Sequence, residues 1–342
     1  MESAKLSARQ RMARITTLLA IAPLIAEVLF GSTHLSMLYL LVPQIFIYGG
    51  AALIIRTLAR GRGWSAILIL GIAFAIAEEC IILQTSVSPP YQHLLFGSAP
   101  NQDYLGEFGI NWAYLLWALV YESIWAIVLP IQITELIFPD QREEPWIGRR
   151  GLVVAAVFFL LPSYGVWYTF TQAGIAPGLA YEAPFPLLLI ALAIIGGLVA
   201  LALVRLPTPR SEAKNIHPVP RPWLVGLIAF FLSLPWFSLA ILPYIVPATV
   251  PTTISIMIGL IWAAISFLLV RHWSSSSTWH DAHRLALSFG ALIASMLAGF
   301  VINGPALSPF DLMGKAVINV IAVLLLVYLA CKIRRRATIV DA

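Results

Sequence analysis

Apolar runs of about 18 to 25 residues recur along the whole chain, and they constrain its fold more than any other feature. Each run is long enough to cross roughly 30 Å of hydrocarbon as an α-helix. Because a backbone inside lipid must satisfy its own hydrogen bonds, such runs predict helices rather than open sheets. We therefore expect an all-α, polytopic integral membrane protein with about ten transmembrane helices. The expected spans lie near residues 15–30, 35–55, 64–84, 110–138, 151–170, 186–205, 223–243, 253–271, 284–303 and 314–331.

Composition supports a membrane protein and excludes several other classes. Of the 342 residues, 60% are hydrophobic and 11% are charged, against roughly 25% charged residues in soluble domains. The net charge of +5 does not indicate a nucleic-acid partner, because no segment between the apolar runs is long enough to fold alone. The lipid bilayer is the expected partner. Cys80 and Cys331 are the only cysteines, so neither a disulfide framework nor a thiolate metal site is indicated.

The basic residues predict the orientation of the chain in the membrane. Cytoplasmic loops are enriched in Lys and Arg, and here 20 of the 21 basic residues lie in alternate connections; only Lys315 does not. The sequence therefore predicts a cell-membrane protein with both termini in the cytoplasm. The basic clusters lie at 5–14, 56–62, 142–150, 205–221, 271–284 and 332–336.

Single cysteines should report this topology directly. In a background without Cys80 and Cys331, Ser98→Cys should react with an impermeant thiol reagent on intact cells, because the 85–109 connection is expected outside. Ser275→Cys should react only after the membrane is permeabilised. Labelling of the Ser275 variant alone on intact cells contradicts the orientation.

The spans are expected to divide by function. Residues 1–14 form a cytoplasmic tail, 15–138 the first four spans, 139–150 a cytoplasmic loop, 151–331 six scaffold spans and 332–342 a basic tail. The 110–138 run contains Pro130 and predicts either one kinked helix or a span followed by an interfacial segment. Ten spans also allow two inverted halves of five, as in many transporters, although no repeat is visible in the sequence.

Intramembrane acids mark the candidate site. Glu27, Glu78, Glu79 and Glu122 fall in the middle to outer part of the first four spans, whereas the six later spans are expected to hold no charge in their apolar cores. An ionised side chain at the bilayer centre costs on the order of 3 kcal/mol, so each of these acids is a functional-site hypothesis. Glu79 follows Glu78 by about 100° around the helix, so the two side chains cannot point in one direction.

Helical spacing adds three polar neighbours to the acids. His34 shares the face of Glu27 if that helix continues far enough, Gln44 lies on the second span, and Tyr121 lies on the fourth. With the four glutamates, these three residues form the expected substrate-binding or ion-binding set. A stripe of small residues that includes Gly71 predicts close packing of the third span against a neighbour.

The need to neutralise the intramembrane acids without a basic residue favours a transporter. The first four spans contain no Lys or Arg within their apolar parts, so the acids require protons, a bound cation or water. The sequence is therefore most consistent with a transporter or permease that uses intramembrane carboxylates for proton or cation coupling. It names neither the substrate nor the oligomeric state.

Two other functions remain open. The AEE sequence at Ala77 to Glu79 resembles the paired-glutamate motif of the CPBP family of intramembrane proteases, which implies a metal-dependent enzyme. In that family an arginine follows the pair and later helices supply histidines, whereas here Cys80 and Ile81 follow, and His280 and His283 lie in a hydrophilic loop. If a metal is bound, the ligand pool is Glu27, His34, Glu78, Glu79 and Glu122. The third possibility is a non-catalytic component of a membrane complex.

Overall fold

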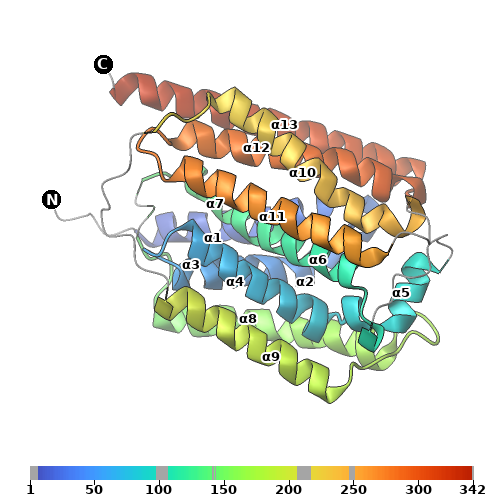
Figure 1. Ribbon diagram of the computed structural model, residues 1–342. Coiled ribbons are helices and arrows are strands. Elements are labelled where there is room, and N and C mark those ends of the chain that lie inside the picture. Colours follow the sequence, from blue (N-terminus) through green and yellow to red (C-terminus); the bar gives the residue numbers. More distant parts are fainter. Residues whose placement is uncertain are drawn as a thin grey trace.

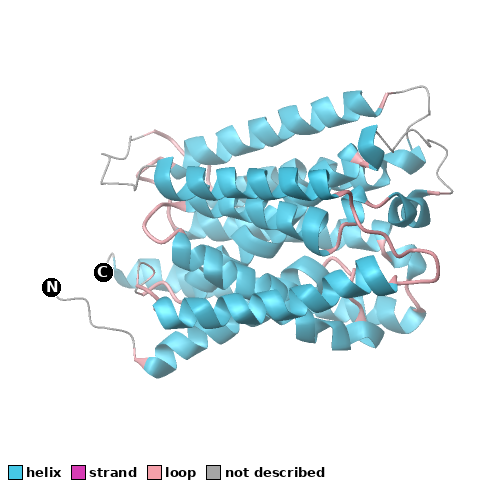
Figure 2. Cartoon of the chain, turned by 90° about the horizontal axis from the view of Figure 1, so that it is seen from below, coloured by secondary structure: helices cyan, strands magenta, loops and turns pink. Residues whose placement is uncertain are grey.

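The computed structural model describes residues 7–97, 107–140, 142, 144–205, 217–245 and 251–340, and these residues form helices and connecting loops without a strand (Figures 1 and 2). Nine helices in this part of the chain are long and apolar enough to cross a membrane, which confirms the polytopic all-α class. They span Leu35–Leu58, Trp64–Ile82, Trp112–Ile137, Arg149–Ala173, Phe185–Arg205, Pro222–Leu239, Thr252–Ser274, Asp281–Ile302 and Pro309–Arg336.

The tenth expected span is the first helix of the chain. It consists of α1 (Ala8–Pro23) and the π-helical turn η1 (Leu24–Val28), and a capping box between Ser7 and Gln10 begins it. Every 18-residue stretch of this helix contains three charges, drawn from its arginines and Glu27, so it is not among the nine.

The first helix starts at the end of the bundle where α13 (Pro309–Val340) finishes (Figure 1). We call this end the basic end, and the end that carries α5 (Pro89–Phe96) the far end.

The first four spans form the centre of the bundle. The second span comprises η2 (Leu35–Leu40), α2 (Leu41–Gln44), η3 (Ile45–Gly49) and α3 (Gly50–Leu58), and the third comprises α4 (Trp64–Ala77) and η4 (Glu78–Ile82). On one side they pack against α8 (Arg149–Tyr168) and α9 (Phe185–Ala200). On the other side lie α10 (Pro222–Ile245), α11 (Thr252–Ser274), α12 (Asp281–Ile302) and α13 (Figure 1).

The fourth span is one continuous helix through Pro130. It runs through α6 (Trp112–Tyr121), η7 (Glu122–Val128) and α7 (Leu129–Ile137). Pro130 lies in the first turn of α7, directly after the π-helical turn. Proline is tolerated there because its missing N–H falls where the regular hydrogen-bond ladder is already interrupted. Of the two alternatives for 110–138, the single helix is correct.

The last helix corrects the expected charge distribution. α13 begins at Pro309, five residues before the expected span, and it buries Asp311 and Lys315. Lys315 Nζ donates to the carbonyl oxygens of Leu29 (2.7 Å) and Phe30 (2.9 Å) at the end of the first helix. The expectation that the six later spans bury no charge is therefore wrong. The charge is tolerated because the main chain that ends the first helix supplies its acceptors.

Candidate functional site

Each of the four central spans contains a π-helical turn with a polar residue of the candidate site. Glu27 lies in η1, Tyr48 in η3, Glu78 begins η4 and Glu122 begins η7. Such turns occur frequently at functional sites, because one extra residue per turn redirects the side chains that follow. They are not specific by themselves, since η8 (Thr169–Ala173) and η9 (Leu201–Arg205) lie outside the site.

Glycines allow the central helices to approach closely. A Cβ atom on Gly49 would lie 2.6 Å from the Cα atom of Leu19 on α1. A Cβ atom on Gly71 would lie 3.1 Å from the carbonyl oxygen of Ser123 on η7. The expected close packing at Gly71 is thus present, and it brings the third and fourth spans together about two turns from Glu78 and directly beside Glu122.

A chain of hydrogen bonds leads from the second span to Glu27. Gln44 Nε2 donates to Thr33 Oγ1 (2.9 Å), and Thr33 Oγ1 donates to Glu27 Oε2 (3.2 Å). The Tyr48 hydroxyl donates to the other carboxyl oxygen of Glu27 (2.8 Å). The same hydroxyl also lies next to the carboxyl group of Glu78. Tyr48 therefore links Glu27 to the third span.

Glu78 and Glu122 form an adjacent pair of buried carboxyl groups. Their residues are only 2% and 7% exposed, and the two carboxyls lie within hydrogen-bonding reach of each other. Atom Oε2 of each carboxyl has no hydrogen-bond partner. A buried polar atom without a partner costs about 1–3 kcal/mol, and more for a charged group. These two oxygens are thus unsatisfied acceptors within the pair, and Gln44 Oε1, elsewhere in the same polar set, also has no partner.

Glu79 points away from this pair and has its own partners. Its Oε2 atom accepts hydrogen bonds from the hydroxyls of Thr85 and Ser86 (2.7 Å for Ser86), just after the end of its helix. Gln92 on α5 donates to the Thr85 carbonyl (2.7 Å), and Asn111 donates to Gln92 (2.8 Å). Glu79 therefore holds the residues that follow its helix in place through hydrogen bonds. Of the two adjacent glutamates, only Glu78 belongs to the candidate site.

His34 does not join the acids. The first helix ends before it, because Gly31 adopts a left-handed φ of 98°. The Nδ1 atom of His34 instead lies 2.9 Å from Ser36 Oγ and 3.2 Å from Asp311 Oδ1. The expected shared face with Glu27 required a continuous helix, and that geometric expectation is wrong.

Tyr121 and Gln44 contact the site only indirectly. Tyr121 donates to the Ala26 carbonyl (2.5 Å) and stacks between Trp117 and Trp125, so it belongs to the aromatic packing of the fourth span. Gln44 reaches Glu27 through Thr33. Neither side chain has a described hydrogen bond to Glu78 or Glu122.

Sequence reasoning missed several of the hydrogen-bonding partners. Thr85 and Ser86 could have been predicted, because hydroxyl side chains in the loop that follows a helix can hydrogen-bond back to an acid in its last turns. Lys315 also stood out, because it is the one basic residue outside the six basic clusters of the sequence. No comparable sequence signal indicated Thr33, which reaches Glu27 only through the turn at Gly31.

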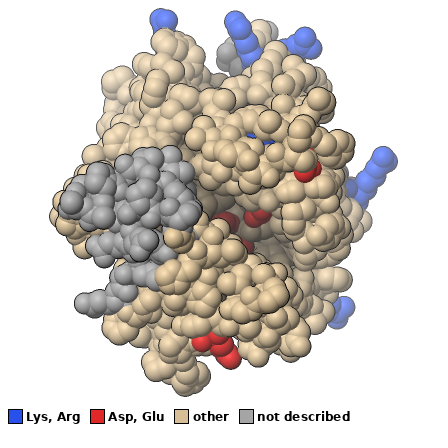
Figure 3. Space-filling model, turned by 90° about the vertical axis from the view of Figure 1, so that its right-hand side faces the viewer, with Lys and Arg blue, Asp and Glu red and all other residues tan. Residues whose placement is uncertain are grey.

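No basic side chain forms an ion pair with the four glutamates among the described residues. Ion pairs in this part of the chain include His34–Asp311, Arg56–Glu135 and Arg142–Asp281. Glu135, the fifth acid of the first four spans, is thus paired with Arg56 and lies apart from the four glutamates of the site. Figure 3 views the far end and shows acidic atoms at the bottom of a hollow.

Within the described ranges, no group of three or more His, Cys, Asp or Glu residues is placed to hold a metal ion. No family model, no curated protein and no solved structure matches the chain.

Proposed function

We propose that this protein is a transporter in which Glu78 and Glu122, with Glu27 beside them, bind a proton or a monovalent cation. The observation that carries the proposal is the adjacent Glu78–Glu122 pair, in which each carboxyl retains one oxygen without a partner. Intramembrane carboxylates that face the interior of a bundle are typical of proton relays and ion pathways.

Electrostatics supports binding of a positive ion at this pair. Two buried carboxylates at contact distance repel each other, so they share a proton or bind a cation unless a base neutralises them. No described ion pair supplies that base. The Tyr48 hydroxyl extends the pair to Glu27, so a proton or cation has three carboxyls within one connected cluster.

Access to the acids differs between the two ends, as alternating access requires. Acidic atoms are visible in the hollow at the far end (Figure 3). Toward the basic end the central helices are closed by tightly packed apolar side chains, among them Leu18, Ile127 and Ile131, which are at most 1% exposed. We assign this conformation to a state that opens toward the far end.

The proposal is tested by the thermal stability of the purified protein in Na⁺, Li⁺ or K⁺ against choline, at several pH values. A ligand that binds only the folded state at about 100 times its Kd adds about 2.7 kcal/mol of stability. We expect one alkali cation to raise Tm by a few degrees, or infrared difference spectra to show a carboxyl that takes up a proton as pH falls. Glu182→Gln, which changes an exposed acid, should leave either response intact.

Treatment of the purified protein with a chelator distinguishes a proton or cation site from a metal site. A proton or monovalent-cation site is indifferent to chelation, whereas a catalytic metal site loses its metal and its stability. Stoichiometric zinc in the purified protein that disappears in Glu78→Gln contradicts the transporter proposal and favours a metal-dependent enzyme. Absence of every cation and proton response also overturns the proposal.

A further inference from the structure

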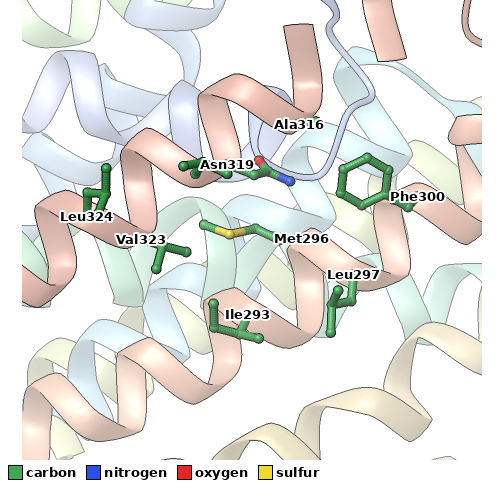
Figure 4. Close-up of a pocket in the computed structure, with 9 residues that line it drawn as sticks. Ile293, Met296, Leu297, Phe300, Ala316, Asn319, Val323 and Leu324 are labelled. Atoms are coloured by element: carbon green, nitrogen blue, oxygen red, sulfur yellow. The ribbon is translucent and has the colours of Figure 1, made fainter. Parts of the chain in front are cut away.

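An apolar groove of about 300 Å³ lies between α12 and α13 (Figure 4), and none of the four glutamates lines it. Several of its side chains are exposed on the outer surface, including Leu297, Val320 and Leu324, so the groove opens laterally toward lipid. It is lined by Ile293, Met296, Leu297 and Phe300 of α12 and by Ala316, Asn319, Val320, Val323 and Leu324 of α13.

One polar side chain lies in this apolar groove. Asn319 is 6% exposed, and neither its amide nitrogen nor its amide oxygen has a hydrogen-bond partner. In hydrocarbon, each unsatisfied polar group costs several kcal/mol. Apart from Gln172 in the terminal turn η8, Asn319 is also the only Asn or Gln within the described helices from α8 to α13. Its position therefore indicates a missing partner that can both donate and accept a hydrogen bond.

Depth restricts the identity of that partner. Asn319 follows Pro309 by ten residues, so it lies about 15 Å along the helix, near the middle of a hydrocarbon core about 30 Å thick. Lipid headgroups lie at the membrane surface, and the acyl chains that reach this depth cannot form hydrogen bonds. A transmembrane helix with a polar side chain at the same depth can satisfy the amide.

The spacing of the lining residues also fits a helix as the occupant. The residues of α12 recur at positions i, i+3, i+4 and i+7, and those of α13 continue the same pattern over more than two turns. A groove between two helices with this periodicity accommodates a third helix through ridge-and-groove packing.

We propose that the α12–α13 groove is a homodimer interface in which Asn319 pairs with Asn319 of a second copy. A two-fold axis along the membrane normal places the two amides at equal depth, so each donates to and accepts from the other. A different partner would have to match that depth independently. Because the amide is covered in the single copy, pairing requires a change of the Asn319 rotamer, for which the groove provides room.

Cross-linking in membranes tests the interface. In a background without Cys80 and Cys331, Val320→Cys should form a disulfide-linked dimer, whereas Leu192→Cys, on the exposed face of α9, should not. Labelled protein in liposomes at low density should bleach in two steps. Asn319→Leu should weaken the dimer roughly sevenfold, as expected for two reciprocal hydrogen bonds of the strength typical in membranes.

The same variant separates the interface from a purely structural role. In detergent-dispersed monomers, Asn319→Leu removes an unsatisfied amide, so we expect Tm to rise while dimerisation weakens. One-step bleaching of the unmodified protein, a cross-linked product that contains a different protein, or a dimer unaffected by Asn319→Leu overturns the proposal. The proposal does not depend on the transport function.

Discussion

Glu78→Gln is expected to abolish proton and cation binding while the protein remains folded. Glutamine keeps the shape and one acceptor of the side chain but removes the titratable charge that faces Glu122. Loss of one partner from a buried charged contact costs about 3–5 kcal/mol, which corresponds to at least a 100-fold loss of affinity. The measurement is the cation-dependent or pH-dependent shift in Tm, together with the infrared carboxyl signal.

The neighbouring acid provides a matched control for this variant. Glu79→Gln changes a carboxyl of the same helical turn and of similar burial, but Glu79 already accepts hydrogen bonds from Thr85 and Ser86. We expect it to lower stability by about 1 kcal/mol, because the amide retains an acceptor for only part of this network, and to leave the cation response unchanged. An equal loss of response in the two variants rules out a specific role for the Glu78–Glu122 pair.

Gly299→Ala is expected to destabilise the protein more than any other glycine-to-alanine change near the site. An added methyl group would overlap the carbonyl group of Phe30, which also accepts hydrogen bonds from Lys315 and Asn303. The obstacle is backbone and cannot rotate away, so the cost should reach the upper part of the range for overpacking, about 3 kcal/mol or more. Thermal unfolding in detergent measures the loss.

Gly196→Ala on α9 is the corresponding control. No atom lies within 4 Å of a Cβ added there, and alanine has the higher helix propensity by about 1 kcal/mol. The Tm of this variant should be unchanged or higher. A Tm loss in Gly299→Ala no greater than in the control contradicts a close contact between α12 and the end of the first helix.

The helical class and most of the span positions were predictable from the sequence, because both follow from local physics. A run of about 20 apolar residues must satisfy its backbone within itself, so the helix is determined before any tertiary contact is known. The divergence of Glu78 and Glu79 was also predictable, since 100° per residue separates adjacent side chains on any helix.

The membership of the site depended on tertiary structure. Helical spacing placed His34 with Glu27, but the turn at Gly31 ends the helix before His34. The imidazole of His34 therefore lies beside Asp311, a residue 277 positions later in the chain. Spacing also could not show that Tyr48 lies between Glu27 and Glu78, because that contact joins three separate helices.

The sequence by itself determined where the chain can cross a membrane and which acids lie within it, because burial in lipid acts on each segment separately. Only the tertiary structure decided which acids meet, which are satisfied by hydroxyls and where Lys315 finds its acceptors. The physical reason is that side-chain pairing between helices depends on their rotation and depth relative to one another. In this protein the π-helical turns change the rotation of a helix, and the glycine contacts set how closely two helices pack. Each of these local features therefore decides which side chains meet, even when the residues are far apart in the chain.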